Sequence, residues 1–229
     1  NHSMHAEALR WDDASAQLSR HQSLIAGYLV FTVVAIIWAG FSWLQHRQLV
    51  AGLFVALQTS ALLLALTLLG VLRLYGPPAM HPFLNTLTSL AIMLSATVTI
   101  LFHRAVLSEL GVGRVGVRWL SVMAGVPLMA LGAMALGELR WGLLLTQLSV
   151  ICSLVLSTLL AFTVPLRDEF GWRTAFWRRA YVIAMYGVMT ALLFPQSLRV
   201  LGLLSLDSWS YMAFPAYSVF SALLQGCLL

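Results

Sequence analysis

The sequence contains no lysine, and only 9% of its 229 residues carry a charge. A soluble domain usually has about 25% charged residues. Hydrophobic residues make up 60% of the chain, and they occur in long uncharged stretches that are typical of membrane-spanning helices. This composition excludes a water-soluble globular domain, and the missing lysine excludes a retinal Schiff base.

Acidic residues and cysteines are also scarce. The aspartates and glutamates all fall in predicted loops or at the ends of apolar stretches. Ion-coupled transporters usually place carboxylates near the bilayer midplane, so this distribution argues against transport. Cys152 and Cys227 both lie within apolar stretches, which does not fit a disulfide framework.

The sequence has no H-E-x-x-H, G-x-S-x-G or P-loop motif. We therefore expect no catalytic residue, metal site or cofactor in this region. A membrane haem needs two facing histidines at similar depth, but His81 and His103 lie at opposite ends of one apolar stretch, about 33 Å apart along a helix. His46 and His103 can share one face, but nothing else indicates a metal. We interpret the histidines as membrane-interface side chains.

Seven apolar segments are each long enough to cross a bilayer, which takes about 20 residues in a helix. Lipid offers no partner for free backbone groups, so segments without the alternation of a barrel strand must be helical. The sequence thus predicts an all-α membrane protein, with a seven-transmembrane helix bundle in residues 24–229. The predicted spans are residues 24–44, 49–72, 83–107, 117–136, 141–164, 178–198 and 209–229.

The arginines indicate how the bundle is oriented, because short arginine-rich loops stay in the cytoplasm. Most arginines follow the first, third and fifth spans, among them Arg104, Arg114, Arg118, Arg178 and Arg179. We predict that the N-terminus lies outside, that the C-terminus is cytoplasmic, and that these five arginines form a cytoplasmic relay face. The arginines are spread between apolar spans and form no basic face with side chains that could read base edges, so we expect the lipid bilayer as a partner and not nucleic acid.

Polar residues inside the spans recur at helical spacing. Ser149 and Ser153 belong to such a stripe in the fifth span, with Gln147 beside them, while Gln58 and Asn85 lie in the second and third spans. Small and polar side chains at this spacing let membrane helices approach closely and hydrogen-bond to one another. The alternative interpretation is an intramembrane ligand cavity lined by these glutamines and the asparagine.

Several segments resemble the membrane domain of the 7TMR-DISM family, which comprises bacterial seven-transmembrane receptors with diverse intracellular signalling modules. "EALRWDDASAQLSRHQSLIAGYLVF" resembles the family's exit from an extracellular domain into the first span, and "SWLQHRQLVAGLFVALQTSALLLALTLLG" is similar to its first cytoplasmic turn and second span. "LNTLTSLAIMLSATVTILFHRAVLSEL" resembles its third span. "AYSVFSALLQGCLL" resembles its seventh span, where the family often has an acidic residue near the position of Gln225.

The resemblance implies a receptor of the bacterial inner membrane. It would relay a small-molecule or upstream-domain signal to a cytoplasmic output module, above all a diguanylate cyclase or histidine kinase, and would work as a homodimer. Residues 1–23 would be an extracytoplasmic linker or the end of an upstream sensor domain. The output module would follow Leu229, outside this chain, so the region itself is expected not to be an enzyme. The alternative is a small-molecule transporter or a channel subunit.

Overall fold

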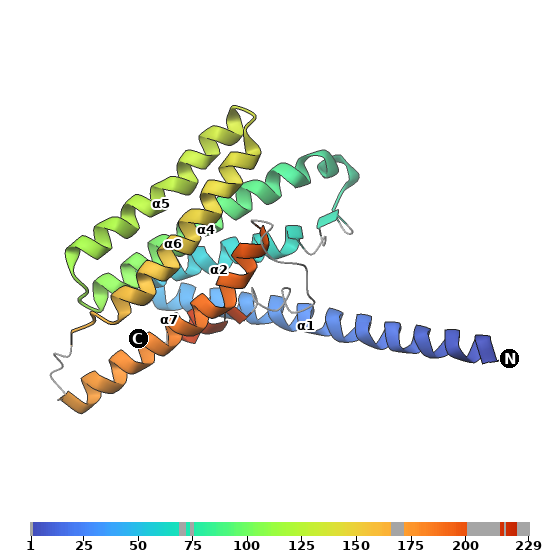
Figure 1. Cartoon of the computed structure of the whole chain (residues 1–229), viewed down its shortest axis with the longest axis horizontal. Coiled ribbons are helices and arrows are strands. Elements are labelled where there is room, and N and C mark those ends of the chain that lie inside the picture. Colours follow the sequence, from blue (N-terminus) through green and yellow to red (C-terminus); the bar gives the residue numbers. More distant parts are fainter. Residues whose placement is uncertain are drawn as a thin grey trace.

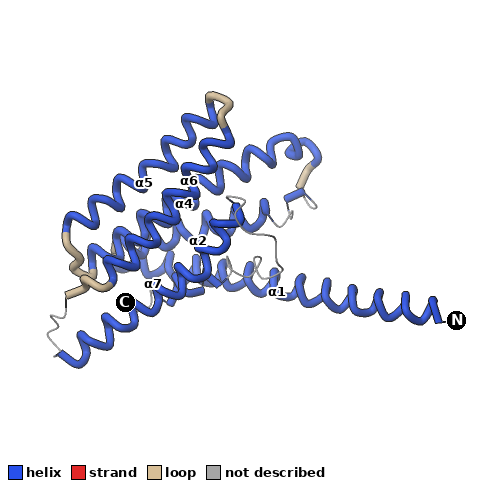
Figure 2. The backbone as a smooth tube through the Cα atoms, in the orientation of Figure 1, coloured by secondary structure: helices blue, strands red, loops and turns tan. Residues whose placement is uncertain are grey.

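The computed structural model describes the backbone of residues 2–68, 72–73, 76–165, 172–200, 216–217 and 219–223. Within this part every regular element is a helix, and the turns from α4 to α5 and from α5 to α6 are short (Figure 2). In chain order, the helices are α1 (His2–His46), α2 (Leu49–Leu68), the 3₁₀ helix η1 (Pro78–Phe83), α4 (Leu84–Glu109), α5 (Arg114–Ala135), α6 (Leu139–Ala161) and α7 (Trp172–Val200). Residues 216–217 and 219–223 are also helical and are called the C-terminal helical segment below.

Five helical stretches among the described residues are long and apolar enough to cross a membrane. They are Ile25–His46, Leu49–Leu68, His81–Glu109, Arg114–Ala135 and Leu139–Ala161. These stretches confirm the helical, multi-pass character predicted from the sequence, and they agree closely with its first five spans. The sixth predicted span, 178–198, falls within α7, which is not among the five. The seventh, 209–229, lies mostly outside the described residues, so the count of seven and the orientation stay predictions.

The first helix is longer than a membrane span. α1 runs without a break from His2 to His46, which corresponds to about 67 Å of helix at the standard rise per residue. No glycine or proline occurs before Gly27, and alanine and leucine, both good helix formers, are frequent there. Figure 1 shows α1 extending well beyond the other helices toward the N-terminus. The polar residues that precede the first span are therefore a helical extension of it.

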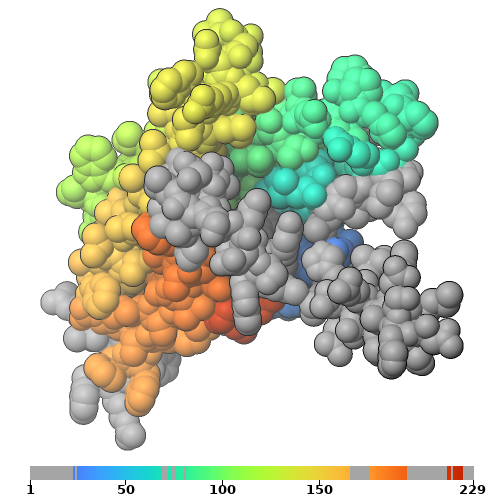
Figure 3. All heavy atoms as spheres, turned by 45° about the vertical axis from the view of Figure 1, so that its right-hand side comes forward, coloured from blue at the N-terminus to red at the C-terminus, as the bar shows by residue number. Residues whose placement is uncertain are grey.

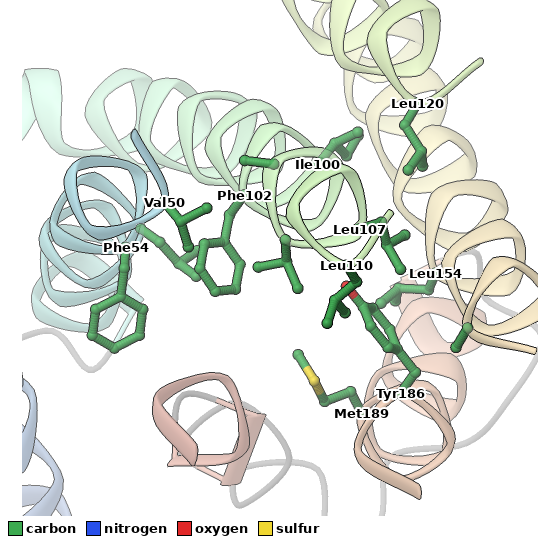
Figure 4. Close-up of a cluster of buried hydrophobic side chains, with 14 of the residues drawn as sticks. Val50, Phe54, Ile100, Phe102, Leu107, Leu110, Leu120, Leu154, Tyr186 and Met189 are labelled. Carbon is green, nitrogen blue, oxygen red and sulfur yellow. The ribbon is translucent and has the colours of Figure 1, made fainter. Parts of the chain in front are cut away.

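α4 occupies the centre of the bundle and packs against α2, α5 and α6. α1 packs on the other side of α2, and α7 lies along α6, as its orange surface beside the yellow surface of α6 shows in Figure 3. The core between these helices contains Phe54 of α2, Phe102 of α4, Leu154 of α6 and Met189 of α7, each almost completely buried (Figure 4). A residue on α4 is thus well placed to contact several helices at once.

A glycine allows α6 to come close to two of its neighbours. A Cβ atom on Gly142 would lie 2.9 Å from the carbonyl oxygen of Ala130 in α5 and 3.1 Å from the Cε atom of Met93 in α4. The same face of α6 continues with small hydroxyl residues that are all buried. They are Thr146, Ser149, Ser153 and Ser157. Small side chains on this face let α6 pack closely against the centre of the bundle.

Candidate functional site: a buried histidine between two tyrosines

His103 lies near the C-terminal end of α4 and is completely buried, with an exposed fraction of 0%. The prediction that it is an interfacial side chain is therefore wrong, because protein encloses it on every side. Burying a polar ring is unfavourable unless its nitrogens find hydrogen-bond partners. An ionisable residue enclosed within a membrane helix is therefore the first place to look for function.

Both ring nitrogens of His103 have a partner on another helix. Its Nε2 atom lies 2.8 Å from the hydroxyl oxygen of Tyr217, which belongs to the C-terminal helical segment. Its Nδ1 atom lies 3.3 Å from the hydroxyl oxygen of Tyr186 in α7. In Figure 4 the Tyr186 side chain extends from α7 toward α4 with its hydroxyl foremost. One imidazole therefore joins three helical elements.

The arrangement satisfies the ring in either tautomer. A neutral imidazole has one nitrogen that donates and one that accepts, while a tyrosine hydroxyl can do both. Thr99, one turn before His103 on α4, is also buried. Tyr186, His103 and Tyr217 thus form a continuous chain of polar groups inside an apolar core.

Aromatic packing fixes the position of the imidazole ring. The ring centroid of His103 lies 5.3 Å from that of Tyr186, 6.2 Å from that of Tyr217 and 5.5 Å from that of Phe102. Phe102 in turn packs on Phe54 of α2 at 5.8 Å. These tilted and edge-on geometries are the favourable ones for aromatic pairs. The histidine therefore has a defined orientation as well as two hydrogen-bond partners.

Two further polar contacts hold the C-terminal helical segment. The Gln58 side chain of α2 donates to the hydroxyl of Ser221 at 3.3 Å, and both residues are fully buried. The Tyr181 hydroxyl of α7 donates to the backbone carbonyl of Leu223 at 3.0 Å. Together with the bond between His103 and Tyr217, these contacts attach the segment to α2, α4 and α7 through hydrogen bonds.

The residues predicted as an intramembrane ligand site have different surroundings. Gln58 is fully buried against Ser221, whereas Asn85 is exposed and accepts a hydrogen bond from Arg73 at 3.3 Å. Gln147 is half-buried on α6. The structure thus gives Gln58 and Asn85 separate partners.

Ser149 and Ser153 are buried on α6, where their hydroxyls donate to carbonyls of the preceding turn at 2.8 Å. This bonding is typical of serines that pack in a membrane helix, since it leaves no polar group without a partner. The hydroxyl of Ser157 has no hydrogen-bond partner among the described residues. A ligand role for these side chains stays a prediction.

The five arginines predicted as a relay face lie where α4 ends, α5 begins and α7 begins. Arg114, Arg118 and Arg178 are exposed, whereas Arg104 and Arg179 are half-buried. The guanidinium group of Arg179 donates to the backbone carbonyl of Phe162, the C-cap residue of α6. A cation at a helix C-terminus is favourable because the last carbonyls lack partners within the helix. A relay function for these arginines stays a prediction.

Sequence reasoning missed the tyrosines and misplaced the histidine. Two features of the sequence pointed to them: an ionisable residue inside a predicted span, and tyrosines in apolar segments, whose hydroxyls usually find partners when buried. Neither feature shows which helices meet. The pairing joins residues 83 and 114 positions apart, and only the fold brings them together.

A scan against protein-family models found no match for this chain, and searches of curated proteins and of solved structures found none either. The helices themselves define the class, which is a multi-pass helical membrane protein. Within that class, the chemistry of the buried polar chain is the guide to function.

Proposed function

We propose that this chain is the membrane-spanning signalling domain of a receptor, which relays a signal from outside the cell to a cytoplasmic output module. The observation that carries the proposal is that His103 connects three helical elements through Tyr186 and Tyr217, an arrangement called the joint below. Both of its ring nitrogens bind other helices, and no part of the side chain is exposed. Groups that move ions or substrates across a membrane usually face a water-filled path. A histidine enclosed in this way instead couples the positions of helices.

The shape of α1 supports the same function. Its continuous helix leads from the polar N-terminal stretch into the bundle, where it packs against α2. α2 packs against α4, which carries His103. A displacement of the N-terminal extension therefore has a route of packed helices toward the buried histidine. Such a relay needs two arrangements of the bundle that the signal stabilises to different extents.

The resemblance to the 7TMR-DISM family agrees with this proposal. On that basis the N-terminus is extracytoplasmic, the C-terminus faces the cytoplasm of a bacterium, and the receptor acts as a homodimer. A diguanylate cyclase or histidine kinase following the last span would then receive the signal. The arginines near the ends of α4, α5 and α7 would lie on the cytoplasmic side, where arginine-rich loops remain.

A chimeric reporter tests the proposal. The whole chain is fused after Leu229 to the catalytic domain of a diguanylate cyclase, and the cyclic dinucleotide is measured in bacteria. We expect His103→Leu to change the output at least threefold at equal protein level, because it disconnects three helical elements. Thr190→Val is the matched control, since it removes a 2.8 Å hydrogen bond between α6 and α7 that does not involve His103. Equal outputs from the wild type and His103→Leu would contradict the proposal.

A further inference from the structure

Side chains from several helices attach the C-terminal helical segment to the bundle. Three side chains from three different helices hydrogen-bond to it: His103 of α4, Gln58 of α2 and Tyr181 of α7. Tyr217 and Ser221 stand four residues apart, so their side chains lie on one face of a helix. That face is fully buried, whereas Val219 and Leu223 are exposed.

Hydrogen bonds suit a contact that has to open and close in a membrane. Apolar side chains lose little when they exchange a protein neighbour for lipid, because lipid tails are as apolar as they are. A hydrogen bond between helices is directional, so a small displacement of one helix is enough to break it. Bonds of this kind are each worth only about 0.6–2 kcal/mol in membrane proteins, so they can be broken and remade.

His103 bonds a second tyrosine in addition to Tyr217. When Tyr217 moves away, the imidazole can keep its bond to Tyr186, so α4 and α7 stay connected. The Tyr217 hydroxyl, in contrast, loses its bond to His103. Opening at this point therefore removes one of the three hydrogen-bonded attachments of the C-terminal helical segment, while α4 and α7 stay connected.

We propose that the hydrogen bond between His103 and Tyr217 is a latch, and that its opening loosens the C-terminal helical segment, which is the moving part of the bundle. This inference rests on the proposed signalling function and names its moving element. The latched arrangement is the resting state. A signal arriving through α1, α2 and α4 displaces the imidazole from Tyr217, and the segment changes its position relative to α2 and α4.

Hydrogen exchange of the purified chain in lipid nanodiscs, followed by mass spectrometry, tests the latch. Tyr217→Phe keeps the ring and removes only the hydroxyl. We expect it to speed exchange in residues 216–223 about tenfold, the size that loss of a hydrogen bond between membrane helices allows. The exchange of α5 and α6 should stay as in the wild type. A uniform acceleration across all helices would overturn the proposal, because it would show general loosening.

Three more variants sharpen the test. His103→Leu should match Tyr217→Phe, whereas His103→Gln, which retains a donor and an acceptor, should restore slow exchange. Thr190→Val breaks the bond to Thr158 and should leave residues 216–223 unchanged. Wild-type exchange in Tyr217→Phe, or an equal effect of Thr190→Val, would overturn the latch. A spin label at the exposed Val219 gives a second measurement, with faster label motion expected in Tyr217→Phe.

The two proposals can fail separately. Faster exchange in Tyr217→Phe without any change in the cyclase reporter would support the latch and contradict the signalling function. A changed reporter output with wild-type exchange would overturn the latch and leave the signalling function standing. Agreement of both measurements supports both proposals.

Discussion

The Nε2 atom of His103 lies 2.8 Å from the hydroxyl of Tyr217, although the two residues are 114 positions apart in the chain. This contact joins the central helix α4 to the C-terminal helical segment inside an apolar core. The neighbouring contact between Nδ1 and Tyr186 adds α7 to the same joint. A single imidazole therefore links three parts of the bundle, and several consequences of this link can be measured.

Gln58 and Ser221 should be energetically coupled. The variants Gln58→Leu, Ser221→Ala and their combination form a double-mutant cycle, which isolates the interaction of the pair. We expect a coupling free energy of about 0.6–1.7 kcal/mol, the range for hydrogen bonds between membrane helices. The free energy of unfolding in bicelles is the quantity to measure. A cycle on Thr158 and Thr190, which are 2.8 Å apart, is the comparison. Strictly additive effects of Gln58→Leu and Ser221→Ala would rule out the contact.

Gly142 should tolerate no larger residue. In Gly142→Ala the new methyl group would lie 2.9 Å from the backbone oxygen of Ala130, so α5 and α6 have to move apart. We expect the free energy of unfolding to fall by about 1–3 kcal/mol, as overpacking usually costs. Gly125→Ala in α5 is the control, because its new methyl group would lie within 4 Å of no atom from another helix. A similar loss of stability in both variants would show that packing at Gly142 is not the cause.

Arg104, Arg114 and Arg118 should determine the orientation of the bundle. Replacing all three with glutamate removes the positive charge around the turn between α4 and α5. We expect a reporter inserted at the exposed Gly113 to lose its cytoplasmic signal in part of the molecules. Arg140→Glu, near the start of α6, changes charge at the opposite end of α5 and should not have this effect. Unchanged topology in the triple variant would show that these three arginines do not determine the orientation of the bundle.

Cys152 reports whether α6 faces lipid. Its thiol is free and exposed on the surface of the bundle. Thiolates form poorly in hydrocarbon, and the thiolate is the reactive form. In a chain carrying Cys227→Ala, we expect a charged maleimide to leave Cys152 unmodified in membranes and to label it fully in denaturing detergent. A cysteine placed at the exposed Ser108, near the end of α4, should react in membranes. Rapid labelling of Cys152 in membranes would place water against this face.

The helices were predictable because each depends on a local property of the sequence. Apolar runs located α2, α4, α5 and α6 to within a few residues, since a membrane helix needs a continuous apolar stretch. The regular spacing of Ser149 and Ser153 likewise indicated a packed helix face, and both are buried. The helical extension of α1 was missed, because hydropathy alone does not identify a polar helix.

The buried joint could not be predicted from the sequence, and the reason is physical. His103 stands near the end of its span, and histidines in such positions usually reach toward the headgroups. Whether it does so depends on what packs against that turn of α4. Here Tyr186 and Tyr217 come from distant segments, and no local pattern connects either one to His103. The same holds for Gln58, whose partner Ser221 is 163 positions away.

The most direct test of the joint is nitrogen NMR of histidine-labelled protein in lipid bilayers. The signals lost in His103→Gln belong to the imidazole of His103. We predict that Tyr217→Phe shifts the Nε2 signal and leaves Nδ1 nearly unchanged, and that Tyr186→Phe does the reverse. Ring-nitrogen chemical shifts that stay the same in both variants would contradict the account. So would an imidazole N–H proton that exchanges freely with bulk water.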